Sequence, residues 1–125
     1  MWRALRLVGT RAADAGLVIN PDGPRNQLGG GIVRAASMTL NERVTLDRDG
    51  ITSLDWGSYP ILRFSEVPEI EATIVRNPDR LPPGMGECTF GPTAATAANA
   101  VAHTLNVRVR GMPLTRERIA ATLAR

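Results

Sequence analysis

The residues with the clearest chemical potential lie in the segment 81–92, LPPGMGECTFGP, where one carboxylate, Glu87, stands among prolines and glycines. Proline fixes φ and glycine opens conformations closed to other residues, so together they give a loop a defined path. A loop longer than about 12 residues in a compact domain is usually functional or disordered, and the prolines argue against disorder. The pattern makes Glu87 a candidate for a chemical role. An ordinary loop acid is the alternative interpretation.

Other reactive side chains give weaker signals. His103 lies in an apolar stretch and is expected to be a packing or solvent-edge residue. No third group is evident that would orient it toward Cys88, so a nucleophile pair is not predicted. The turn Asp47–Gly50 lacks the spaced ligands and closing glutamate of a calcium loop. With one cysteine, the chain cannot form a disulfide framework or a cysteine-rich metal site of its own, and no metal-ligating residues are predicted.

Composition and charge narrow the class of protein. Apolar residues make up 43% of the 125 residues and aromatic residues 4%, so a core of small aliphatic side chains is expected. All 15 basic residues are arginine, and they are scattered over a chain whose net charge is only +3. Nucleic acid is therefore not an expected partner. No apolar stretch has the length of a signal peptide or a membrane span, and the expected location is cytoplasmic.

Three helices are expected to position these residues. Apolar residues recur at helical spacing over 24–42, despite the glycines at 29–31, each of which costs a helix about 1 kcal/mol relative to alanine. Three glycines there suggest close approach of another backbone or of a ligand. A second helix is predicted from Pro92 to about Leu105, ended by Asn106, and a third over 116–123, capped at Thr115.

The predicted strands are short. Residues 17–19 are interpreted as the buried end of a strand, residues 44–46 and 51–54 as a hairpin around Asp47–Gly50, and residues 70–75 as a further strand. The predicted fold class is α+β: a small mixed sheet packed by two main helices plus a short C-terminal helix, within one domain.

Four stretches of the sequence carry a resemblance to a known family. They are DAGLVINPDGPRNQLGGGI (14–32), WGSYPILRFSEVPEIE (56–71), GMGE (84–87) and GPTAATAANAVAHTLNVRVRGMPLTRERI (91–119). In this order the sequence resembles the C-terminal end of the molybdopterin-binding large subunit of the xanthine dehydrogenase and aldehyde oxidase family. It is most similar to the bacterial branch with isoquinoline 1-oxidoreductase and nicotinate dehydrogenase. The resemblance implies that residues 1–125 are the C-terminal segment of a molybdopterin-binding domain.

The resemblance also implies roles for individual residues. Glu87 matches the catalytic base beside the molybdenum, and Gln27 matches a glutamine that hydrogen-bonds the pterin, whose amide can both donate and accept. Gly86 is implied to bring a backbone N–H near the cofactor. The sequence departs from the family pattern at three positions, Gly29, Arg34 and Cys88. The first two concern the pterin pocket, and none of the three is the base.

The implied activity is hydroxylation of an aldehyde or an N-heterocycle with water-derived oxygen. Its implied cofactor is molybdenum-molybdopterin, with the cytosine dinucleotide as one form. Implied partners are the remainder of the molybdopterin-binding subunit, an iron–sulfur subunit and, in some assemblies, an FAD subunit. The isolated chain is not expected to be active. The alternative interpretation is that the chain is a non-catalytic structural or interaction module that binds no cofactor on its own.

Overall fold

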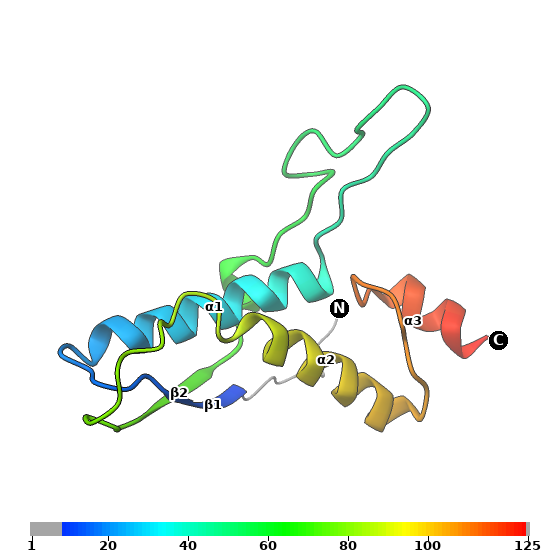
Figure 1. Ribbon diagram of the computed structural model, residues 1–125. Helices are drawn as coiled ribbons and strands as arrows, with labels where there is room; N and C mark the ends of the chain where they lie inside the picture. The colour runs from blue at the N-terminus through cyan, green and yellow to red at the C-terminus, as the bar shows by residue number, and fades with distance from the viewer. Residues whose placement is uncertain (1–8, 125) are drawn as a thin grey trace.

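The computed structural model describes residues 9–124 of the chain. A strand, a long helix and a second strand come first, followed by two further helices (Figure 1). The elements, in order, are β1 (Gly9–Asp14), α1 (Asp22–Leu40), the 3-10 helix η1 (Phe64–Glu66), β2 (Ile70–Val75), α2 (Phe90–Leu105) and α3 (Arg116–Leu123). The predicted α+β class, with two main helices and a short C-terminal one, is confirmed.

β1 and β2 form a two-stranded parallel sheet in which Gly9 pairs with Ile70 and Asp14 with Val75. A parallel pair needs a long crossover connection, and here the crossover contains α1. Helix α1 contacts both β2 and α2, so it forms the centre of the molecule. The prediction of residues 70–75 as a strand is confirmed.

The core is built from small aliphatic side chains, as the composition predicts. On α1 the buried apolar residues include Leu28, Ile32, Ala35 and Ala36. A second cluster joins α2 to the C-terminal segment, through Ala97, Val101, Leu114 and Ile119. The backbone N–H of Leu114 donates to the Thr39 carbonyl at 2.7 Å, which ties this segment to the end of α1.

The helix ends follow the capping signals in the sequence. Asn106 takes the left-handed conformation, with φ of 51°, and ends α2. The Thr115 hydroxyl accepts from the Arg118 backbone N–H at 3.3 Å and caps α3. Helix α2 begins at Phe90, so Pro92 occupies its first turn but not its first position. Helix α1 lies two residues before the predicted range.

Two strand predictions are wrong. Residues 17–19 are not a strand, and Ile19 is 93% exposed, because the chain turns at Gly16 (φ of 64°) after β1 has ended at Asp14. The predicted hairpin over 44–54 is reduced to a single antiparallel bridge, Leu46↔Ile51, around the expected turn. An isolated two-stranded hairpin is marginal in water, and no third strand within residues 9–124 supports this one.

Residues 41–69, called the arm below, connect α1 to β2 as a long excursion beyond the helices (Figure 1). Its base is tied to α1 by the ion pair of Arg34 with Glu42 at 3.0 Å and by the Leu62 backbone N–H, which donates to Ser37 Oγ at 2.9 Å. Within the arm, the Tyr59 hydroxyl donates to Glu42 Oε2 at 2.8 Å. Large apolar side chains elsewhere on the arm are exposed, namely Leu46, Leu54, Trp56 and Phe64. Among residues 9–124, no helix is both long and apolar enough to cross a membrane.

Candidate functional site

Glu87 lies in the loop 76–89, which connects β2 to α2 and is called the base loop below. The loop is fixed at its start by Asp14, the last residue of β1. One Asp14 oxygen accepts from the Gly16 backbone N–H at 2.8 Å, and the other accepts from Asn77 Nδ2 at 3.2 Å and Arg80 Nη1 at 2.9 Å. These hydrogen bonds, led by the one from Gly16, lower the pKa of the Asp14 carboxyl.

Gly16 brings the two segments into close contact. Its backbone lies so near the loop that a β-carbon at this position would stand 2.7 Å from the Leu81 carbonyl oxygen. The positive φ of 64° at Gly16 is itself a conformation that favours glycine. Next to it, the Leu17 backbone N–H donates to the Arg80 carbonyl at 2.9 Å. The sequence analysis did not find this anchor, although the short-range pairing of an aspartate with a glycine two residues later is a known turn signal.

The structure brings together the three predicted site residues. Gln27, in the second turn of α1, donates from Nε2 to the Gly86 carbonyl oxygen at 3.1 Å, a contact between residues 59 apart in sequence. Glu87 follows Gly86 directly, so this bond holds the backbone beside the candidate base. The atom of Gly86 that is engaged is its carbonyl, whereas the resemblance assigned a role to its N–H.

The end of the base loop is fixed by a tight helix junction. The Phe90 backbone N–H donates to the Glu87 carbonyl at 3.1 Å, which closes a turn before α2 begins. Gly31 is buried against Thr89, and a β-carbon at Gly31 would overlap the Thr89 hydroxyl. A close approach is therefore present at Gly31, but the neighbouring group is the Thr89 side chain and not the backbone or ligand that was expected. A β-carbon at Gly29 or Gly30 would meet no described atom within 4 Å, so both present an open surface.

The Glu87 side chain itself is exposed, and its carboxylate forms no hydrogen bond with another described residue. The apolar neighbours Met85 and Phe90 are themselves only half-buried and do not bury Glu87. A fixed backbone therefore presents an accessible carboxylate. Such a group can accept a proton from any partner that reaches it.

Arg34 turns away from the base loop. Its guanidinium donates to both carboxylate oxygens of Glu42, at 3.0 and 3.1 Å, and the Glu42 side chain is only 2% exposed. Glu42 also accepts the Tyr59 hydroxyl, which raises the pKa of the tyrosine. The departure from the family pattern at Arg34 thus serves the base of the arm. Sequence analysis missed this cluster because its members lie 8 and 17 residues apart in an irregular segment.

The remaining candidates do not converge on a site. Cys88 is exposed, with its thiol 3.8 Å from the Met85 carbonyl, and His103 is exposed in the last turn of α2. Within residues 9–124, no three histidine, cysteine or acidic side chains are grouped so that they could hold a metal ion.

Comparison with known proteins finds oxidoreductases. A subunit of nicotinate dehydrogenase from Pseudomonas putida is 38% identical over 110 residues, which are 88% of this chain and 9% of that protein. The beta subunit of isoquinoline 1-oxidoreductase from Brevundimonas diminuta is 31% identical over 103 residues, 82% of this chain and 13% of that protein. A membrane-bound aldehyde dehydrogenase of Gluconacetobacter polyoxogenes, named for pyrroloquinoline-quinone, is 29% identical over 84% of this chain and 14% of that protein.

Comparison with solved structures also finds oxidoreductases. Quinoline 2-oxidoreductase from Pseudomonas putida 86 matches with a TM-score of 0.79 and 31% identity, over 94% of this chain and 16% of that chain. The Cu,Mo-CO dehydrogenase matches with a TM-score of 0.77 over 92% of this chain and 16% of that chain, and its 22% identity shows the fold alone. No protein-family model matches the sequence.

The chain spans only 9% to 14% of the length of the curated relatives that it matches. Two of those relatives carry the names to which the sequence resemblance pointed, and both are named as subunits. The resemblance to this group of oxidoreductases is confirmed. The names do not say which cofactor the matching segment contacts.

Proposed function

We propose that this chain is the C-terminal part of a molybdopterin-binding subunit in an oxidoreductase of the xanthine dehydrogenase and aldehyde oxidase family, and that it supplies the catalytic base of the enzyme. The observation that carries the proposal is the hydrogen bond from Gln27 to the Gly86 carbonyl. It joins the segment to which the resemblance assigns the pterin contact with the loop to which it assigns the base.

The residues at this junction fit a pterin-type cofactor. Gln27 is exposed, and the bond to Gly86 uses one of its amide hydrogens, so an amide hydrogen and the carbonyl oxygen remain for a ligand. The adjacent glycines 29 and 30 leave space that a side chain would fill. A flat group with its own donors and acceptors can therefore reach the Gln27 amide without displacing described atoms.

Glu87 would act as the base at the edge of this surface. Its carboxylate is unengaged among the described residues, while its backbone is held on both sides, by Gln27 at Gly86 and by the Phe90 N–H. The bound cofactor would supply the two-electron oxidation of the substrate carbon. Glu87 Oε would take up the proton released when the water-derived oxygen adds to that carbon, which is placement-dependent general-base catalysis.

The substrate proposed is an N-heterocycle or an aldehyde, as the relatives are named for nicotinate, isoquinoline, quinoline and aldehyde. The rest of the site would come from the remainder of the subunit, and electrons would leave through iron–sulfur and flavin partners. Gly29 and Arg34 depart from the family pattern, and Arg34 is paired with Glu42 outside this surface.

The test is Glu87→Gln in the assembled enzyme, with Glu69→Gln, an exposed acid outside the site, as the matched control. We expect Glu87→Gln to lower turnover by about a hundredfold or more, the scale of general-base catalysis, with bound molybdenum unchanged. Glu69→Gln should leave both unchanged. Gln27→Leu should lower the molybdenum content, measured by mass spectrometry.

Two outcomes would contradict the proposal. Undiminished turnover in the Glu87→Gln variant would show that Glu87 is not the catalytic base. It would favour a purely structural role for the chain. A purified subunit that carries flavin absorbance but no molybdenum would place this segment in a flavin-binding subunit.

A further inference from the structure

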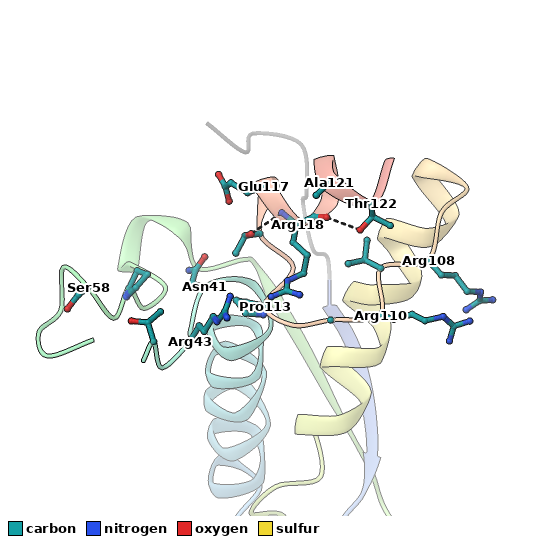
Figure 2. Close-up of a pocket in the computed structure, with 15 residues that line it drawn as sticks. Asn41, Arg43, Ser58, Arg108, Arg110, Pro113, Glu117, Arg118, Ala121 and Thr122 are labelled. Atoms are coloured by element: carbon teal, nitrogen blue, oxygen red, sulfur yellow. Dashed lines mark hydrogen bonds between the residues drawn. The ribbon is translucent and has the colours of Figure 1, made fainter. Parts of the chain in front are cut away.

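A second surface lies at the opposite end of α1 from Gln27. It is an open cavity of about 850 Å³ between the base of the arm, the segment 108–115 and α3 (Figure 2). Arg43, in its lining, lies 16 residues after Gln27, which corresponds to roughly 20 Å along the helix axis and its extension. The cavity is therefore separate from the base loop.

Among the described residues, four arginines line this cavity: Arg43, Arg108, Arg110 and Arg118. None of their guanidinium groups forms an ion pair or a hydrogen bond with another residue in the range 9–124. The arginines that do form ion pairs there are Arg25, Arg34 and Arg80, all elsewhere. Like charges repel, and an anion between Arg43 and Arg118, which both reach toward Pro113 in Figure 2, would relieve the repulsion of that pair.

Glu117, the acid among the described lining residues, does not neutralise them. Figure 2 shows Glu117 directed away from Arg43 and Arg118. The pKa of Glu117 is lowered by its own backbone N–H, by the Thr115 hydroxyl and by Arg116, so its charge is already stabilised on the outer side of α3.

The Arg118 side chain is positioned by Gly111. A β-carbon at Gly111 would lie 2.5 Å from Arg118 Nη1, so the guanidinium rests directly on the glycine backbone. In Figure 2, Arg43 and Arg118 reach toward Pro113 from two sides, while Arg108 and Arg110 extend on the side of α2. The positive groups thus face in two directions along the cavity.

We propose that this cavity binds an acidic polypeptide segment of the enzyme in which the chain works. Guanidinium groups bind carboxylates through paired, charge-assisted hydrogen bonds. Their spread suits several carboxylates along a strand better than one compact phosphate. None of the described residues that line the cavity is aromatic, so these residues offer a nucleotide base no stacking partner.

The rim has the composition of a protein interface. Met112 and Leu123, each next to lining residues, are 59% and 53% exposed. Methionine and arginine are enriched at protein interfaces. The assignment of the acidic segment to the same enzyme rests on the proposed function. The preference of the cavity for a carboxylate-rich peptide rests on the cavity alone.

The experiment uses the full chain and a fluorescein-labelled peptide of twelve alternating glutamate and alanine residues, followed by fluorescence anisotropy. We expect saturable binding that weakens about tenfold or more in Arg43→Gln/Arg118→Gln, the loss of two charge-assisted contacts. Arg76→Gln, an exposed arginine outside the cavity, removes the same kind of charge and should change the affinity less than twofold. Gly111→Ala should weaken binding several-fold at unchanged net charge, because it displaces the Arg118 guanidinium.

Circular dichroism of each variant verifies the helices, and Arg108→Gln, at an exposed position, replaces the double variant if that one does not fold. Equal weakening by Arg76→Gln, or no effect of Gly111→Ala, would overturn the proposal in favour of diffuse charge attraction. Binding of inorganic pyrophosphate with no binding of the peptide would overturn it in favour of a phosphate site. None of these measurements involves molybdenum, so they remain interpretable if the proposed catalytic function fails.

Discussion

The base loop and the arm are both long irregular connections, yet the protein holds them in different ways. The base loop is fixed at three places, by Asp14 at its start, by Gln27 at Gly86 and by the junction of Thr89 with Gly31. The arm is tied to α1 at its base, through Glu42 and Ser37, and exposes Leu46 and Trp56 farther out. A loop gains a defined position from hydrogen bonds to distant elements, and proline and glycine only make that position accessible.

The largest effect is expected where the base loop meets α1. Gly31→Ala should lower the free energy of unfolding by about 2 kcal/mol, because the added methyl overlaps the buried Thr89 side chain. Gly30→Ala, one residue earlier at an open position, should raise it by up to about 1 kcal/mol through helix propensity. Urea unfolding measures both. An equal change in the free energy of unfolding for Gly31→Ala and Gly30→Ala would contradict the close packing of Gly31 against Thr89.

A somewhat smaller effect is expected at the base of the arm. Glu42→Ala should cost about 2 kcal/mol or less, since it removes the acceptor for Arg34 and Tyr59, while the half-exposed Arg34 keeps part of its solvation. Glu69→Ala, an exposed acid at the other end of the arm, is the control and should change stability little. If the two variants unfold at the same urea concentration, the arm is not held by Glu42.

The smallest effect is expected at Asp14 and depends on pH. Because the folded state lowers the Asp14 pKa, the ionised carboxylate stabilises the fold above its unfolded value of about 4, and this contribution is lost as the pH falls through the lower folded value. Asp14→Asn should therefore be less stable than the wild type at pH 7, and the difference should shrink toward pH 3. Urea midpoints across this range measure it. A difference that is constant with pH would exclude the linkage.

Local signals in the sequence predicted the helices and β2 well. Helical spacing gave α1 and α2 to within two residues, and Thr115 and Asn106 marked helix ends where the structure has them. The strand assigned to residues 17–19 failed because an apolar triplet cannot reveal that its neighbours turn at Gly16. Register with a distant strand, here β1 with β2, is set by long-range pairing and has no local signal.

For the candidate site, the resemblance supplied Glu87, Gln27 and Gly86, and the structure placed them at one junction. What could not be predicted were the groups that hold this junction from outside, such as Asp14. Nor could the arginine cavity be predicted, because Arg43 and Arg118 are distant in sequence and the arginines appear scattered along the chain.

The bond from Gln27 to Gly86 favours one orientation of the side-chain amide, with the nitrogen toward the base loop. Because the nitrogen donates to a carbonyl at 3.1 Å, the amide oxygen points the other way, and its polarity is no longer free to reverse. A visiting molecule that contacts this oxygen must therefore offer it a hydrogen, whereas the second amide hydrogen calls for an acceptor. Glutamate, almost the same shape, would set two electron-rich oxygens against each other across the same gap.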